Sequence, residues 1–144
     1  MVEVKILNES KYSNPSYAKK GDAGVDLYAD IENDIILEPL ARKLIQTNIS
    51  IKLPDGYEAQ IRPRSGLAYK YGITVLNTPG TIDSEYTGKI GIILINLSND
   101  DFIINPGDRI AQMVINKYEK VSFTNVDKLE ETERGSGGFG HTGN

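Results

Sequence analysis

The chain has 144 residues, and 16 lysines and arginines against 20 aspartates and glutamates give it a formal net charge of −4. This length fits one domain, which buries roughly 68–70% of its unfolded surface and needs no disulfide or metal to hold its core. The absence of cysteine excludes a disulfide framework, a thiolate zinc site and a cysteine nucleophile. The acidic balance argues against a groove that follows many nucleic-acid phosphates, whereas a small anionic ligand is compatible with it.

The first eight residues alternate polar and apolar side chains and lack the continuous apolar stretch of a signal peptide. No apolar run reaches the length that spans a membrane. We therefore expect a soluble protein of the cytoplasm or another intracellular compartment, the nucleus included, that binds neither nucleic acid nor membrane.

Short segments in which apolar and polar residues alternate recur between turn signals along most of the chain. This pattern is typical of an all-β sandwich or jelly roll rather than of alternating strands and helices. In chain order, it predicts strands at 2–7, 25–29, 34–38, 44–53, 57–62, 73–76, 89–97, 101–104 and 109–118. The clearest is 44–53, whose alternate residues from Ile45 to Leu53 share one face before the turn at 54–56.

One short helix is predicted over residues 65–71, between two of these strands. Ser65 can cap its first turn, and the residues that follow favour a helix well enough. Gly72 can end it, so one or two turns are expected.

The composition changes near Glu130. Residues 130–133 are mostly acidic, and residues 134–144 contain five glycines and one aromatic residue, Phe139. A segment of this kind is expected to be mobile when it is alone. We therefore predict one β domain over residues 1–130, followed by a flexible arm over residues 131–144.

Asp26 lies in an apolar strand, where alternation directs it to the face opposite Val25 and Leu27. An ionised carboxylate in such a place needs a partner. The partner is either an arginine or lysine, which is the commoner arrangement, or the water shell of a bound metal.

Arg64, Ser65 and Gly66 place a cation, a hydroxyl and a glycine amide where a strand leads into the helix. Free amides at the beginning of a helix favour anions, so this junction is a candidate phosphate site. An ordinary helix cap beside two surface arginines explains the same residues equally well.

Residues 80–88 lie between a strand that ends near Leu76 and the strand at 89–97, which predicts the turn and flanks of a hairpin. Asp83, Tyr86 and several backbone amides gather there. Taken alone, Asp83 fits a solvated turn in which its carboxylate makes a local hydrogen bond. A chemical role for Asp83 requires partners from elsewhere in the chain.

Gln112 is predicted to share a strand face with Ile110 and Val114. A buried glutamine must find hydrogen-bond partners, which are either backbone groups or a ligand.

The arm has the glycine spacing of a phosphate-binding loop from Gly135 to Thr142, except that His141 replaces the lysine. A strap that wraps phosphates with its glycine amides and Arg134 is one interpretation. A disordered linker is the other.

The order and spacing of these segments resemble the five motifs of the trimeric deoxyuridine triphosphatase (dUTPase) family over residues 21–143. The motifs stand here as Ala23-Gly24-Val25-Asp26-Leu27, Pro63-Arg64-Ser65-Gly66-Leu67-Ala68, Gly80-Thr81-Ile82-Asp83-Ser84-Glu85-Tyr86-Thr87-Gly88, Gly107-Asp108-Arg109-Ile110-Ala111-Gln112 and the tail 134–143. The resemblance implies a jelly-roll subunit in a homotrimer, with three active sites at subunit interfaces. It also implies that the arm of one subunit closes a site that its neighbours build.

The resemblance implies that the protein hydrolyses dUTP to dUMP and pyrophosphate, which limits uracil incorporation into DNA and supplies dUMP for dTMP synthesis. Asp83 is then the base that activates water for attack on the α-phosphorus, and Tyr86 packs beneath the deoxyribose. Phe139 stacks on uracil. The residues implied to read the uracil edge are Asn77, Thr81, Ile82 and Gly91. The residues implied to bind the phosphates are Arg64, Ser65, Gly66, Gln112, Arg134, Ser136, Gly140 and Thr142.

The resemblance also implies a Mg²⁺ ion that the triphosphate chelates, with Asp26 holding its water shell. A triphosphate brings several negative charges, and a hard cation that keeps its waters is suited to them. Two other readings stay open, namely a dCTP deaminase of the same fold family and a non-catalytic nucleotide-sensing module. A sugar-binding jelly roll is the plain all-β alternative.

Overall fold

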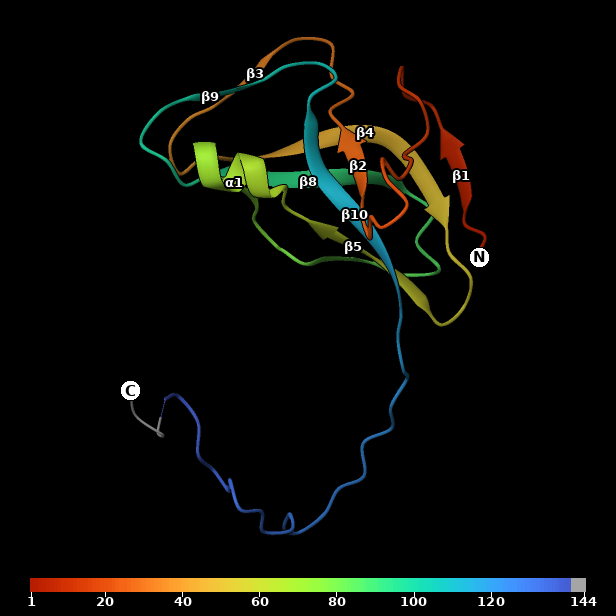
Figure 1. The fold of residues 1–144 in the computed structure, drawn as a ribbon, viewed down its shortest axis with the longest axis vertical. Helices are drawn as coiled ribbons and strands as arrows, with labels where there is room; N and C mark the ends of the chain where they lie inside the picture. The colour runs from red at the N-terminus through yellow and green to blue at the C-terminus, as the bar shows by residue number, and fades with distance from the viewer. Residues whose placement is uncertain (141–144) are drawn as a thin grey trace.

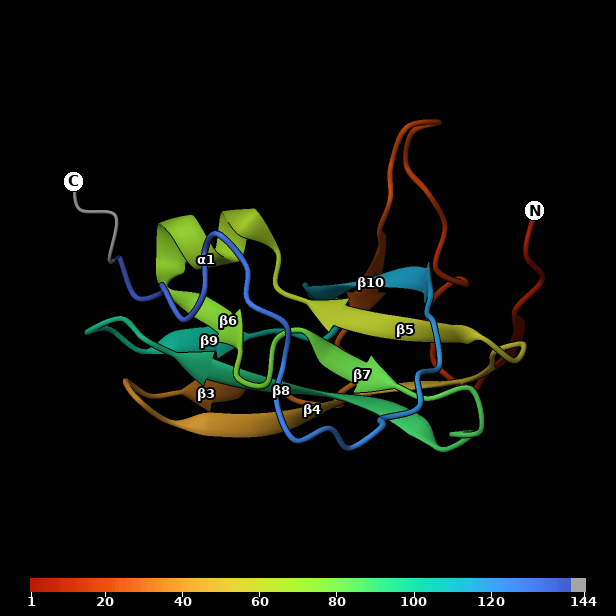
Figure 2. The same cartoon turned by 90° about the horizontal axis from the view of Figure 1, so that it is seen from below.

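The computed structural model describes residues 1–140, which form two four-stranded antiparallel sheets, a two-stranded sheet, one short helix and a long C-terminal segment (Figures 1 and 2). The elements are β1 (Lys5–Asn8), β2 (Val25–Tyr28), β3 (Ile35–Leu37), β4 (Arg42–Lys52), β5 (Tyr57–Arg62), α1 (Ser65–Tyr71), β6 (Ile73–Val75), β7 (Gly80–Ile82), β8 (Lys89–Asn96), β9 (Phe102–Ile104) and β10 (Arg109–Lys117). The first sheet has the order β1-β4-β8-β6, the second has the order β2-β10-β5-β7, and β3 pairs with β9. The predicted all-β sandwich is therefore confirmed, although the first strand begins at Lys5 rather than at residue 2.

Strand β4 shows why the two large sheets pack together. Its alternate side chains Ile45, Thr47 and Ile49 are buried, and Ile51 and Leu53 continue the same face. They lie in one core with residues of the opposite sheet, among them Leu27 and Ala111. Each fully buried leucine or isoleucine contributes roughly 1.5–3 kcal/mol relative to its exposed state, so the shared face of these strands holds the sandwich together.

The two strands predicted on either side of residues 80–88 pair as expected, since β6 lies antiparallel to β8 with Val75 opposite Leu94, but the connection between them is not a simple turn. Strand β7 pairs with β5 in the second sheet, with Gly80 opposite Ile61, whereas β8 pairs with β4 and β6 in the first sheet. Residues 83–88 therefore cross from one sheet to the other. Two strands that follow each other along the chain need not pair, and local alternation does not reveal which partner a strand selects.

The predicted helix has the expected bounds, but its predicted cap is wrong. The N-cap is Arg64, which has an extended backbone and no side-chain cap bond, and Ser65 is already the first helical residue. Gly72 ends the helix as expected, with φ at 66° and its amide bonded to Ala68 O. The helix thus starts directly after the strand end that carries Arg64.

After β10 the chain leaves the two sheets as a long segment without strands, drawn in blue in Figure 1. The amide of Tyr118 still bonds Gly56 O, and the segment then extends away from the domain. In the part of the chain that the structure describes, no helix has the length and apolar character needed to cross a membrane.

Asn96, at the end of β8, joins three parts of the chain although it is fully buried. Its Nδ2 atom donates to Leu37 O at 2.8 Å and to Asp100 O at 2.7 Å. Its Oδ1 atom accepts from the amide and the hydroxyl of Ser98 at 2.9 and 2.8 Å. The side chain therefore fixes β3 against the β8–β9 connection.

We expect Asn96→Ala to lower the free energy of unfolding by about 2–4 kcal/mol, because two backbone carbonyls lose their donors. Urea denaturation measures the change, and Asn99→Ala is the matched control because Asn99 is exposed. Equal stability of the two variants would contradict this structural role of Asn96.

Candidate active site

A surface hollow of about 160 Å³ lies beside the segment that joins β7 to β8. It is lined by Thr81, Ile82, Asp83, Tyr86, Lys89, Ile90 and Gly91. Most of these residues are those that the sequence analysis selected for the base, the sugar and the attacking water. A second hollow, of about 490 Å³, shares Asp83 and Tyr86 and is completed by Asp55, Ser84, Glu85 and Lys120.

Asp83 stands where the two hollows meet. A turn fixes its backbone, since the amide of Tyr86 donates to Asp83 O at 3.1 Å. Its side chain is exposed, and among residues 1–140 the carboxylate forms no hydrogen bond or ion pair, so the local bond considered from the sequence is not made. A carboxylate in this state is able to accept a proton from a water molecule.

Tyr86 is held from two sides. Its hydroxyl donates to Lys89 O at 3.0 Å. A methyl group built on Gly88 would lie 2.6 Å from the same hydroxyl oxygen, so the ring lies directly against the Gly88 backbone. The ring therefore forms a fixed wall of both hollows.

Asn77 lies between β6 and β7, just before the cis peptide bond that joins Thr78 to Pro79. Its Nδ2 atom would be 3.2 Å from a methyl group built on Gly80, the first residue of β7. Asn77 therefore packs beside the first residue of the strand that carries Thr81 and Ile82, although it does not itself line the smaller hollow.

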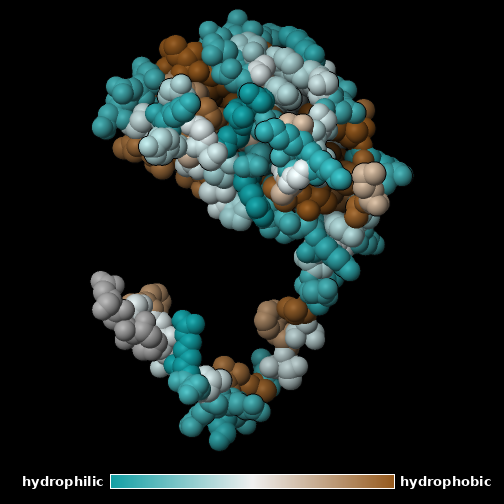
Figure 3. Space-filling model, in the orientation of Figure 1, coloured by the Kyte–Doolittle hydropathy of each residue, from teal (hydrophilic) through white to brown (hydrophobic). Residues whose placement is uncertain are grey.

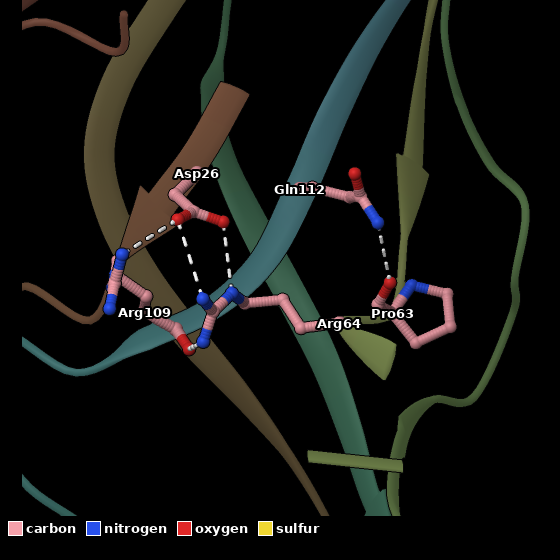
Figure 4. Close-up of polar contacts among 5 residues, drawn as sticks. All are labelled: Asp26, Pro63, Arg64, Arg109 and Gln112. Atoms are coloured by element: carbon pink, nitrogen blue, oxygen red, sulfur yellow. Dashed lines mark hydrogen bonds and ion pairs between the residues drawn. The ribbon is translucent and has the colours of Figure 1, made fainter. Parts of the chain in front are cut away.

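A cluster of charged side chains, which we call the arginine cluster, consists of Asp26, Arg64 and Arg109 (Figure 4). Arg64 Nε lies 2.9 Å from Asp26 Oδ1, and Arg109 Nη1 lies 3.3 Å from Asp26 Oδ2. Arg64 Nη1 also donates to Arg109 O at 3.3 Å. Of the two partners predicted for Asp26, arginine is therefore the one present, and one carboxylate faces two guanidinium groups.

Gln112 lies beside the arginine cluster because β10 pairs with β2 and β5. Asp26 is opposite Gln112 on one side, and Arg62 is opposite it on the other. The Gln112 side chain is half-buried, and its Nε2 atom donates to Pro63 O at 3.0 Å (Figure 4). Of the two kinds of partner predicted for Gln112, a backbone group is therefore the one present. The Oε1 atom of Gln112 is directed away from Pro63.

Gly24 has a contact that only a glycine permits. A methyl group built on it would lie 2.5 Å from Gln112 Oε1, nearer than a real side chain approaches. The missing side chain at residue 24 leaves room for the carboxamide of Gln112, whose Oε1 atom lies beside Gly24 while its Nε2 atom bonds Pro63 O.

Ser65 and Gly66 form the first turn of α1, next to the arginine cluster, and both are exposed. The first amides of a helix have no partner within the helix, which makes them available to an anion. A methyl group built on Gly66 would meet no atom within 4 Å, so this turn is open.

The arm is far from both groups of residues within the same chain. Arg134 Nε donates to Gly137 O at 3.0 Å, and the amide of Gly135 bonds Thr132. Ser136 and Gly140 are exposed, as is Phe139. His141 and Thr142 lie outside the described residues. Figure 1 shows the described arm projecting away from the sheets.

A single chain thus carries three separate parts of the predicted site. In residues 1–140, the two hollows beside Asp83 are lined by other residues than those of the arginine cluster, and the arm reaches neither part. No group of three histidines, cysteines, aspartates or glutamates gathers there to bind a metal ion.

The sequence analysis missed Arg109 and the packing roles of Gly24 and Gly88. Arg109 begins β10, where the pairing with β2 shifts register, and its guanidinium contacts Asp26. Its place in the fourth motif was the available signal. Gly24 and Gly88 likewise stand in the first and third motifs, but the sequence does not show their contacts, which come from residues that approach them only in the folded chain.

A model of the dUTPase family matches residues 10–143 of the chain. The chain is 55% identical to the deoxyuridine 5′-triphosphate nucleotidohydrolase of Finegoldia magna over 99% of both chains. It is 56% identical to that of Rickettsia conorii, over 99% of this chain and 96% of the relative.

The fold of the chain is also similar to solved structures of dUTPases. The dUTPase of Staphylococcus bacteriophage 80alpha with dUPNHPP has a TM-score of 0.85 and 27% identity, over 98% of each chain. A dUTPase mutant from phage phi11 of S. aureus, which coordinates a structural Mg(II) ion, has a TM-score of 0.80 at 24% identity over 90% of this chain and 99% of that one. The chain that carries Asp83, the arginine cluster and the arm belongs to the dUTPase family, and it is a dUTP diphosphatase.

Proposed function

We propose that the protein converts dUTP to dUMP and pyrophosphate through a water molecule that Asp83 activates for attack on the α-phosphorus. The observation that carries this proposal is the exposed carboxylate of Asp83, which has no partner in residues 1–140 and borders two hollows. A positioned base of this kind typically contributes roughly 10²–10⁴ in rate.

The smaller hollow is proposed to hold the deoxyuridine. Thr81, Ile82 and Gly91, which line this hollow, would offer backbone groups to the edge of uracil, and Asn77, which packs beside Gly80, would join them. Tyr86 is proposed to pack beneath the deoxyribose, where an added 2′-hydroxyl would clash. Cytosine reverses a donor and an acceptor at the edge of the base, which would leave buried polar groups without partners.

The phosphates are proposed to bind at the arginine cluster. Two guanidinium groups face one carboxylate, so the cluster has an excess of positive charge. Ser65 and Gly66 add the free amides of α1, and Gln112 lies next to Asp26 in the sheet. Hydrogen bonds between charged partners are roughly twice as strong as neutral ones, which favours a polyphosphate at this place.

Mg²⁺ is proposed to enter with the triphosphate and to offset its negative charge. Asp26 accepts three contacts from Arg64 and Arg109, whereas a carboxylate offers about four acceptor positions. One position is therefore left for a water molecule of a hydrated ion. Mg²⁺ keeps several waters and binds few protein groups, in keeping with the lack of a cluster of metal ligands in residues 1–140.

A homotrimer is proposed because one chain leaves the three parts of the site apart. The segment between β10 and the arm also exposes apolar side chains, which are brown in Figure 3. They are Val121, Phe123, Val126 and Leu129, with exposed fractions of 70%, 94%, 61% and 84%. Apolar side chains that gather along one exposed segment are typical of a contact surface, and a neighbouring copy of the chain is the proposed partner.

The arm, residues 131–144, is proposed to close a site that neighbouring subunits build. Arg134 would bind the terminal phosphate, Phe139 would stack on uracil, and Ser136, Gly140 and Thr142 would bind the phosphate chain. Ordering a glycine-rich segment costs conformational entropy, which these contacts offset only when the nucleotide is bound. We further propose an intracellular role in limiting uracil incorporation into DNA and in supplying dUMP for dTMP synthesis.

We expect the protein with Mg²⁺ to release pyrophosphate from dUTP much faster than from UTP, and not from dCTP or dTTP, and we expect Asp83→Asn to reduce turnover by at least about 10²-fold. Pyrophosphate and ammonia are measured for each nucleotide, and Glu85→Gln is the matched control because Glu85 lines only the larger hollow. Ammonia from dCTP would indicate a deaminase, and binding without pyrophosphate would indicate a sensing module. Near-normal turnover by Asp83→Asn would remove Asp83 from the mechanism.

Deletion of residues 134–144 is expected to reduce activity on dUTP sharply and to leave the fold and the assembly unchanged. The described hydrogen bonds of residues 134–140 are formed within the arm itself, so their loss does not weaken the sheets. Thermal melting and size-exclusion chromatography check the fold and the assembly. A fully active truncated protein would refute closure by the arm.

Gly24→Ala is expected to raise the KM for dUTP about tenfold and to change kcat less, because the added methyl group displaces Gln112 from the phosphate site. Gly21→Ala is the matched control, since a methyl group there meets no atom within 4 Å. In a Gln112→Ala background, Gly24→Ala is expected to have little further effect. A tenfold rise in KM in that background as well would show that Gly24 acts by another route.

A further inference from the structure

We propose that Gly88 determines the sugar specificity of the site, because it sets the position of the Tyr86 ring. This inference rests on the proposed packing of Tyr86 beneath the deoxyribose. It concerns a residue that touches the ring rather than the substrate, so Gly88 is a positioning residue.

The contact between Gly88 and Tyr86 leaves no space for a side chain at residue 88. A methyl group built on Gly88 would lie 2.6 Å from Tyr86 Oη, 2.7 Å from Cζ and 3.0 Å from Cε2. Carbon atoms in contact are ordinarily about 3.5–4.0 Å apart. The hydroxyl end of the ring therefore rests on the backbone of Gly88, and any larger residue would push it away.

The hydrogen bond of Tyr86 fixes the same end of the ring to a rigid part of the fold. Its acceptor, Lys89 O, belongs to the first residue of β8, which pairs with Ser50 of β4. The Lys89 side chain is also tied down, with Nζ 3.4 Å from Glu9 Oε2 and 3.2 Å from Asn48 Oδ1. The acceptor is therefore held by the pairing of β8 with β4 and by the contacts of its own side chain.

Burial alone does not hold the Tyr86 ring. Its exposed fraction is 46%, and it borders both hollows, so it has open space on either side. The contact with Gly88 and the bond to Lys89 O are thus the contacts that set how far the ring reaches into the 160 Å³ hollow. A sugar that fits against the ring in this position would fit less well once the ring moved.

The experiment compares dUTP and UTP in Gly88→Ala. The backbone of Gly88 does not have the positive φ that disfavours alanine, and the clash falls on the far end of an exposed side chain, so the variant is expected to fold. The kcat/KM of this variant for dUTP is expected to fall at least about tenfold, while its kcat/KM for UTP, which is already low, changes little. The selectivity ratio, which is kcat/KM for dUTP divided by kcat/KM for UTP, is therefore expected to fall at least about tenfold. Gly21→Ala adds the same methyl group in open space and is the matched control.

A double-mutant cycle with Tyr86→Ala tests whether Gly88 acts through the ring. In the Tyr86→Ala background, Gly88→Ala is expected to change the selectivity ratio less than twofold. A full tenfold change in that background, or an unchanged ratio in Gly88→Ala alone, would overturn the inference.

Binding measurements separate this inference from the proposed function. The dissociation constants of the α,β-imido analogues of UTP and dUTP give a binding ratio, which measures selectivity between the two sugars without turnover. Failure of the wild-type protein to release pyrophosphate from dUTP would reject the proposed function alone. A binding ratio that falls at least about tenfold in Gly88→Ala supports the role of Gly88, and a ratio within twofold of wild type rejects it.

Discussion

The contact between the inner faces of the two large sheets decides where the polar side chains of the site lie. Val25 and Leu27 are buried in this contact, so Asp26, between them, is directed outward. Ala111 and Met113 are also buried, so Gln112, between them, is directed outward as well. Because β2 and β10 pair with Asp26 opposite Gln112, the two outward side chains become neighbours. A slip of either strand by one residue would turn the polar side chain of that strand toward the core and its apolar side chains outward.

The charges of the site are arranged around a single carboxylate. Asp26 holds Arg64, which precedes the helix, and Arg109, which begins the last strand, although 83 residues separate Asp26 from Arg109. The carboxylate orients both guanidinium groups and offsets only part of their charge, which suits the proposed binding of phosphates there. Orientation before binding reduces the cost of ordering long side chains when the ligand enters.

Much of the fold followed from alternation in the sequence, and the family resemblance is confirmed by the comparisons. Strand β4 is an example, since the residues predicted to share a face from Ile45 to Leu53 are buried. The connection between β6 and β8 did not follow, because residues 80–88 were expected to form a turn and its flanks, whereas residues 80–82 form β7, which pairs with β5. The roles of Gly24 and Gly88 were also out of reach, because an absent side chain has meaning only once its neighbours are known.

The distance between the arm and the hollow of its own chain has a genetic consequence. If each complete site takes Asp83 from one subunit and Arg134 from another, a subunit with a substitution at Asp83 still supplies a functional arm to its neighbour. A copy with a damaged arm likewise still supplies a sound Asp83. A cell that makes both defective forms would then contain mixed assemblies in which some sites are whole. Two alleles that are each inactive alone would therefore restore part of the activity together.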